Sequence, residues 1–110
     1  MNNIKGNENT IFGNFHNLRG SNNGVLGNWN TVKGNTNGLV GNYNYLKGNY
    51  NGVVGNRNGV IGNANGIFGS NNSIYGNANG INGGSNVVIG QQNGVSGNKN
   101  IIVGNGNNVQ

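Results

Sequence analysis

The sequence predicts an all-β fold, a parallel β-solenoid flattened into a β-roll, and three observations lead to it. A glycine recurs at every seventh residue from Gly6 to Gly104, with no insertion or deletion. The sixth residue of the repeat is aliphatic in all sixteen repeats, counting the partial one at the start. The fourth is Asn in fifteen of them, and His16 is the exception. Short repeats that keep their apolar positions in register are typical of solenoids.

Each heptad is expected to hold one short strand at its fifth to seventh residues, as in Thr10-Ile11-Phe12. Side chains alternate between the two faces of a strand, so the sixth residue points inward and its neighbours point outward. A coiled coil is excluded, because each Gly costs about 1 kcal/mol in a helix and a heptad of that kind needs two apolar positions.

The other fixed positions are expected to form the corners between strands. The first-position Gly supplies the freedom for positive φ that a tight corner needs. Asn also suits corners, because its amide bonds nearby backbone and it tolerates the left-handed region. Stacked coil on coil, the fourth-position Asn should form a largely buried hydrogen-bonded column at the strand spacing of about 4.8 Å. His16 is interpreted as a larger polar filler of that column.

The variable positions indicate that two heptads make one coil of 14 residues. With the partial heptad Met1–Lys5 numbered zero, all six basic residues fall in even-numbered heptads. Glycine at the fifth position is almost confined to odd-numbered heptads, with Gly59 the one even case. Residues 1–110 are therefore expected to form a single solenoid domain of about eight coils, about 38 Å long at the cross-strand spacing.

The two sheets are expected to present different outward surfaces. The odd-numbered heptads form what we call the glycine face, with glycines beside an apolar ridge, and its first five strands supply Thr10, Phe12, Gly24, Leu26, Gly38, Val40, Gly52, Val54, Gly66 and Phe68. The even-numbered heptads supply a basic ridge of Lys5, Arg19, Lys33 and Lys47 and an aromatic column of Phe15, Trp29 and Tyr43.

The composition argues against catalysis, cofactors and metal sites. Glu8 is the only acidic residue, His16 is the only histidine, and there is no Cys. Paired carboxylates, thiolate ligands and disulfides are therefore excluded, and no phosphate-binding glycine motif is present. The 56 Gly and Asn residues suggest a disordered tract by number, but their strict periodicity indicates a folded scaffold.

The net charge of +5 raises the possibility of a nucleic-acid partner. The basic ridge and the aromatic column combine cations with stacking platforms, as single-stranded nucleic acid requires. A charged ridge that keeps one sheet soluble is the favoured interpretation. A polysaccharide along the aromatic column is a weaker alternative still. Neither nucleic acid nor glycan is therefore the expected partner. The longest apolar runs are too short to cross a membrane.

The repeat resembles that of the grass ice-recrystallisation-inhibition proteins, the ryegrass-type antifreeze β-rolls. The unit Asn-x-aliphatic-x-Gly carries the resemblance, as in residues 9–13, 30–34 and 72–76. It implies a left-handed roll in which one flat sheet binds ice through its outward strand residues. Those proteins are rich in Thr and Ser at these positions, and this chain has only Thr10, Thr31, Ser73 and Ser96 there. The uncharged glycine face is the candidate ice-binding surface.

The alternative is a self-assembling fibre or oligomer subunit. The repeat reaches both termini, so unpaired strand edges are expected at both ends, where further chains could stack. The glycines beside the apolar ridge could also accept the ridge of a second copy, face to face. No signal peptide is visible, so we expect an extracellular location if the chain is a mature segment and a cytoplasmic one otherwise.

Overall fold

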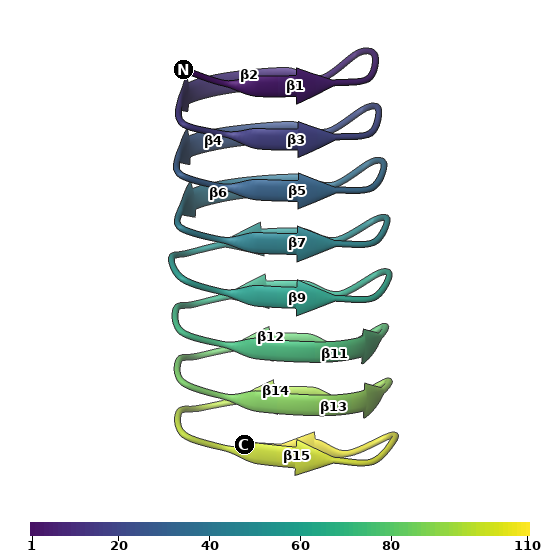
Figure 1. Cartoon of the computed structure of the whole chain (residues 1–110). Helices are drawn as coiled ribbons and strands as arrows, with labels where there is room; N and C mark the ends of the chain where they lie inside the picture. Colours follow the sequence, from purple (N-terminus) through teal and green to yellow (C-terminus); the bar gives the residue numbers. More distant parts are fainter.

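The computed structural model describes all 110 residues and confirms the parallel β-solenoid. Each heptad contributes one strand, and successive strands alternate between two eight-stranded sheets (Figure 1). Every strand therefore pairs with the strand 14 residues away, as Ile67 does with Ile81. The predicted coil of two heptads is confirmed. No helix is present that is long and apolar enough to cross a membrane.

The even-numbered heptads form one sheet, which we call the basic sheet. Its strands, in spatial as well as sequence order, are β1 (Asn3–Lys5), β3 (Asn17–Arg19), β5 (Thr31–Lys33), β7 (Tyr45–Lys47), β9 (Gly59–Ile61), β11 (Ser73–Asn77), β13 (Val87–Gln91) and β15 (Ile101–Val103).

The odd-numbered heptads form the second sheet, which we call the glycine sheet because it carries the glycine face. Its strands are β2 (Thr10–Asn14), β4 (Gly24–Asn28), β6 (Gly38–Asn42), β8 (Gly52–Val54), β10 (Gly66–Phe68), β12 (Gly80–Asn82), β14 (Gly94–Ser96) and β16 (Asn108–Val109).

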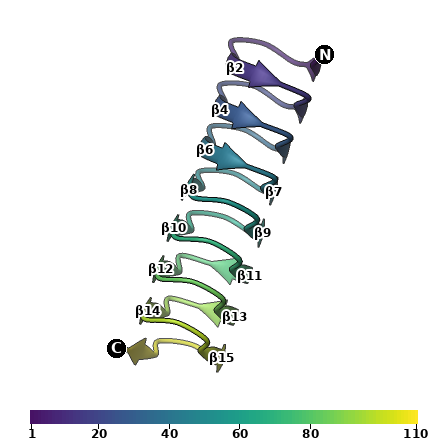
Figure 2. The ribbon, with the colours of Figure 1, turned by 90° about the vertical axis from the view of Figure 1, so that its left-hand side faces the viewer.

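The coil is left-handed, as the resemblance implied. In Figure 1 the basic sheet lies in front with strands running to the right, the glycine sheet returns behind it, and each return steps down to the next coil. Figure 2 shows the two sheets from the side as two parallel rows. The molecule measures 38 × 19 × 13 Å, so its long axis has the predicted length.

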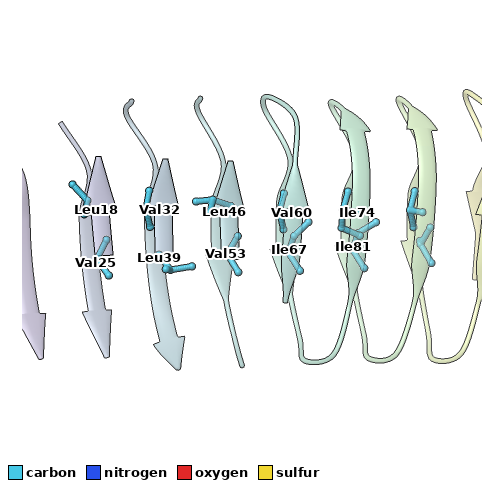
Figure 3. Packing of buried hydrophobic residues seen from close by; sticks show 12 residues of the cluster. Leu18, Val25, Val32, Leu39, Leu46, Val53, Val60, Ile67, Ile74 and Ile81 are labelled. Carbon is cyan, nitrogen blue, oxygen red and sulfur yellow. The ribbon is translucent and has the colours of Figure 1, made fainter. Parts of the chain in front are cut away.

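The core is a single layer of sixth-position side chains between the sheets (Figure 3). Twelve of the sixteen are buried, from Leu18 to Val95. Ile11, Ile102 and Val109 in the end coils are partly buried and pack against this cluster, whereas Ile4 is 41% exposed. The strand pattern read from the sequence is therefore confirmed over the whole chain, with the end coils covered on one side only.

The fourth-position column is the predicted asparagine ladder, and it is buried from His16 to Asn93. At Asn37 the amide nitrogen donates to Oδ1 of Asn23 at 3.1 Å and to the carbonyl of Gly48 at 2.8 Å. Oδ1 of Asn37 accepts the backbone N–H of Asn51 at 2.9 Å. No buried side-chain nitrogen or oxygen lacks a partner, so the polar column is satisfied throughout and fixes the distance between coils.

His16 occupies the same column, as expected, and is 2% exposed. Its Nδ1 lies 3.4 Å from the backbone nitrogen of Asn30, and its Nε2 lies 3.2 Å from the carbonyl oxygen of Phe12. A backbone N–H can only donate and a carbonyl can only accept, so these contacts correspond to a neutral ring protonated at Nε2. Both ring nitrogens are used within the fold.

The corners correct one detail of the sequence prediction. The first-position glycines have positive φ, from 112° to 149°, as expected. The left-handed residue is the third of each heptad, with φ between 57° and 67°, and it is Asn only at Asn22 and Asn71. The flanking Asn residues are engaged between coils, as when Oδ1 of Asn42 accepts the backbone N–H of Asn28 at 2.9 Å. The left-handed turn therefore falls on the residue between them.

Candidate functional site

The glycine face forms one continuous outward surface along β2 to β10. In-register pairing aligns its glycines in one column and its ridge residues in another, as for Gly38 with Gly52 and Val40 with Val54. The two columns border a shallow groove of about 560 Å³ that is lined almost entirely by apolar groups and runs from Thr10 to Val54. All ten predicted face residues therefore lie together on one sheet.

The glycines of this face are not required by the fold. A Cβ built on Gly24, Gly38, Gly52, Gly66 or Gly80 would meet no atom within 4 Å. By contrast, a Cβ on any first-position Gly from Gly6 to Gly90 would overlap the carbonyl of the Gly one coil further on. Glycine in a strand costs about 0.5–1 kcal/mol relative to alanine. The solenoid would therefore accept a larger residue at each of these positions.

The ridge beside the glycine column is apolar and exposed. Exposure is 64% at Phe12, 44% at Val40 and 63% at Phe68. The column continues with polar residues at Asn82, Ser96 and Gln110, and no outward residue of the glycine sheet is charged. Contiguous apolar surface of this kind marks a contact site.

The basic sheet is divided between its first and last four strands. In β1, β3, β5 and β7 the seventh positions carry the basic ridge, which the strand pairing holds in register. In β9, β11, β13 and β15 the same positions carry Ile61, Tyr75, Ile89 and Val103. A second apolar groove of about 280 Å³ lies over this half, where the repeat pattern already placed apolar residues.

The aromatic column lies at the corner between the two sheets. Phe15 and Trp29 stack with ring centroids 4.2 Å apart and an interplanar angle of 7°, and Trp29 and Tyr43 follow at 6.0 Å and 2°. The guanidinium of Arg57 lies 6.0 Å from the Tyr43 ring centroid. The groove here, about 570 Å³, is lined by these four side chains and by Asn14, Asn28, Asn42 and Asn56.

The predicted grouping of the aromatic column with the basic ridge needs correction. The cation that joins the aromatic groove is Arg57, and none of the four ridge cations lines it. The reason is that the ridge occupies the seventh position, at the end of each basic-sheet strand, while the aromatics occupy the corner before the strand begins. The sequence contained the signal, because Arg57 is the next third-position residue after Tyr43 in the even-numbered heptads.

Comparisons with known proteins complete the description. A family model described as the grass antifreeze beta roll matches residues 27–110, from β5 and the corner before it to the last strand. The preceding coils continue the same pairing and the same columns. A comparison with curated proteins gives no match.

Proposed function

Because the chain belongs to the grass antifreeze β-roll family, we propose that it binds ice and inhibits ice recrystallisation without catalysis, through its glycine face. The observation that carries this choice of face is the column of open glycines beside an uncharged apolar ridge. The basic sheet is the poorer candidate, because strongly hydrated ammonium groups on its first half hold their own water.

A surface that matches a crystal must keep its spacing, and the core of this solenoid provides that. The asparagine ladder and the backbone pairing fix every coil against the next, as in the bonds from Asn51 to Asn37 and from Asn51 to Gly62. Outward groups on the glycine face therefore repeat at the strand spacing of about 4.8 Å without adjustable linkers. A rigid surface loses little conformational entropy when it binds.

The glycine column also gives water a place on an otherwise apolar face. The groove beside Val40 and Val54 is open along its length, and no side chain projects from Gly38 or Gly52 to displace water from it. Water beside apolar groups has restricted orientations. The groove would hold such water in rows between the apolar ridge and the strand backbone. These rows of water would take the place of the rows of Thr and Ser hydroxyls that this chain lacks.

A matched pair of double variants tests the choice of face. The first variant, Val40→Lys with Val54→Lys, places two cations on the glycine face, at residues that are 44% and 43% exposed. The second, Ile61→Lys with Ile89→Lys, places two cations on the basic sheet, at residues that are 40% and 45% exposed. In an ice-recrystallisation assay at micromolar protein, we expect the first variant to lose inhibition and the second to keep it. Equal activity of the two, or normal crystal growth with the unaltered chain, would remove the proposal.

A second candidate function, self-association, is favoured by the shape of the same face. A trough and a parallel ridge are self-complementary under a two-fold axis that runs along the solenoid, because that rotation places each ridge over the other copy's trough. Val40 of one copy would then lie opposite Gly38 of the other. A face of 38 by 19 Å covers about 720 Å², so the pair would bury at most roughly 1,400 Å², which is within the range of stable interfaces.

Sizing of the same sample separates the two functions. If the protein is a monomer at all concentrations and inhibits recrystallisation, self-association is excluded and ice binding is the remaining function. A dimer that the Val40→Lys and Val54→Lys variant dissociates supports the face-to-face pair. Association through the end coils stays a prediction of the sequence.

A further inference from the structure

We propose that the basic ridge is a binding site for an extended acidic polysaccharide, which would lie along the solenoid axis across β1, β3, β5 and β7. The site is separate from the glycine face, on the opposite sheet. The ligand class follows from the spacing of the ridge, its uncompensated charge and the polar groups beside it.

The four cations form a straight row with a fixed repeat. Lys5 pairs in register with Arg19, Arg19 with Lys33, and Lys33 with Lys47. All four are exposed outward side chains. Their backbone anchors are therefore one strand spacing apart, about 4.8 Å, so a linear polyanion with one anionic group per repeat of that length can meet each cation in turn.

The charge of the row is not balanced within the chain. Glu8 is the only acidic side chain, so at least three of the four cations have no acidic side-chain partner. Like charges on directly neighbouring strands repel each other. A polyanion along the row replaces this repulsion by attraction and releases counterions as it binds.

The repeat pattern by itself favoured a ridge that keeps the sheet soluble, but the placement of the cations argues against that interpretation. The same column carries Ile61, Tyr75, Ile89 and Val103 on the following strands, so the solenoid accepts uncharged residues there. A ridge that served only to keep the sheet soluble would be expected over the apolar half, where exposure reaches 62% at Tyr75 and 72% at Val103. The cations instead gather on the half that is already polar.

The neighbouring groups favour a glycan over a nucleic acid. The column beside the cations presents the amides of Asn3 and Asn17, the hydroxyl of Thr31 and the ring of Tyr45, which is 39% exposed. These groups can hydrogen-bond sugar hydroxyls or pack on a sugar ring. Single-stranded nucleic acid needs a series of aromatic faces on which its bases stack, whereas Tyr45 is the only aromatic residue among the outward positions of β1, β3, β5 and β7.

Titration calorimetry in low-salt buffer tests the site with an oligogalacturonate of about ten sugars as the probe. Its methyl-esterified form has the same backbone without the charge, a sulfated glycan of equal length compares sulfate with carboxylate, and a ten-nucleotide oligothymidylate represents nucleic acid. The matched variants are Lys33→Gln in the ridge and Lys99→Gln, a corner cation outside it. Both remove one charge, and circular dichroism checks that both remain folded.

We expect the acidic glycans to bind and the methyl ester not to bind. Lys33→Gln should weaken binding by up to about fivefold, while Lys99→Gln leaves it unchanged, and added salt should weaken it further. Equal losses in the two variants would show attraction by net charge alone. Absence of binding, retention of the methyl ester, or tighter binding of the oligothymidylate would each overturn the proposal. Because the ridge lies on the other sheet, none of these results bears on the recrystallisation assay.

Discussion

The side-chain amide of Asn37 donates a 2.8 Å hydrogen bond to the carbonyl oxygen of Gly48, two corners further along the chain. A Cβ on Gly34, one coil before Gly48, would overlap that same oxygen. The asparagine ladder and the first-position glycines therefore depend on each other. The close approach of two coils that excludes a side chain at Gly34 also brings the Gly48 carbonyl within reach of the Asn37 amide. This arrangement recurs along the column, from Asn23 to Asn79 and beyond.

Two glycines four residues apart should respond to alanine in opposite ways. Gly48 has φ of 137° and its Cβ would overlap the carbonyl of Gly62, whereas a Cβ on Gly52 meets nothing. We expect Gly48→Ala to lose at least about 3 kcal/mol of unfolding free energy. Gly52→Ala should gain up to about 1 kcal/mol. Guanidinium unfolding measures both, and similar losses would show that the fifth-position glycines are structural after all.

Removing one rung of the ladder should be costly. Asn51→Ala deletes the donor to the half-buried carbonyl of Gly62 at 2.8 Å and the acceptor of the buried Asn65 backbone N–H at 2.9 Å. Buried groups left without partners cost about 1–3 kcal/mol each, so we expect a loss of about 3 kcal/mol or more. The control is Asn82→Ala on the exposed outward face of the glycine sheet, which should change stability by less than about 0.5 kcal/mol.

The left-handed corners leave room for stabilisation. Thr36 is β-branched and holds φ of 57°, a conformation that is unfavourable by about 1–2 kcal/mol for such a residue. Thr36→Gly should therefore raise the unfolding free energy by about 0.5–1 kcal/mol, after the entropy of a freer unfolded chain is counted. Thr31→Gly, in the strand β5, should lower it by a similar amount. A loss of stability in both variants would contradict the strain assigned to the corner.

The fold could be predicted from the sequence because each fixed position has one physical task. The sixth-position aliphatics, the fourth-position amides and the first-position glycines each repeat without a slip, so strands, core and ladder follow directly. The third-position turn was harder, since residues as different as Glu8, Trp29 and Ala64 occupy it. Composition gives no signal there, and only the backbone shows the shared left-handed conformation.

The sequence predicted which residues lie together on each candidate surface, but it did not show which of those surfaces the fold leaves open. Alternation along the strands assigned Val40 and Lys33 to opposite faces of the solenoid, and pairing at 14 residues aligned their columns. The sequence assigned the first-position glycines to the corners, but the overlap that excludes a side chain at Gly34 and the open space at Gly38 depend on atoms one coil away and are shown by the structure alone. That distinction, between Gly34 and Gly38 for example, is what singles out the glycine face.

Partition into slowly growing ice tests the central claim most directly, because it measures binding rather than its effect on crystal size. The unaltered chain and the Ile61→Lys, Ile89→Lys variant should concentrate in the ice, while the Val40→Lys, Val54→Lys variant should remain in the liquid. Exclusion of the unaltered chain from the ice, or enrichment of the glycine-face variant to the same extent as the unaltered chain, would contradict the account.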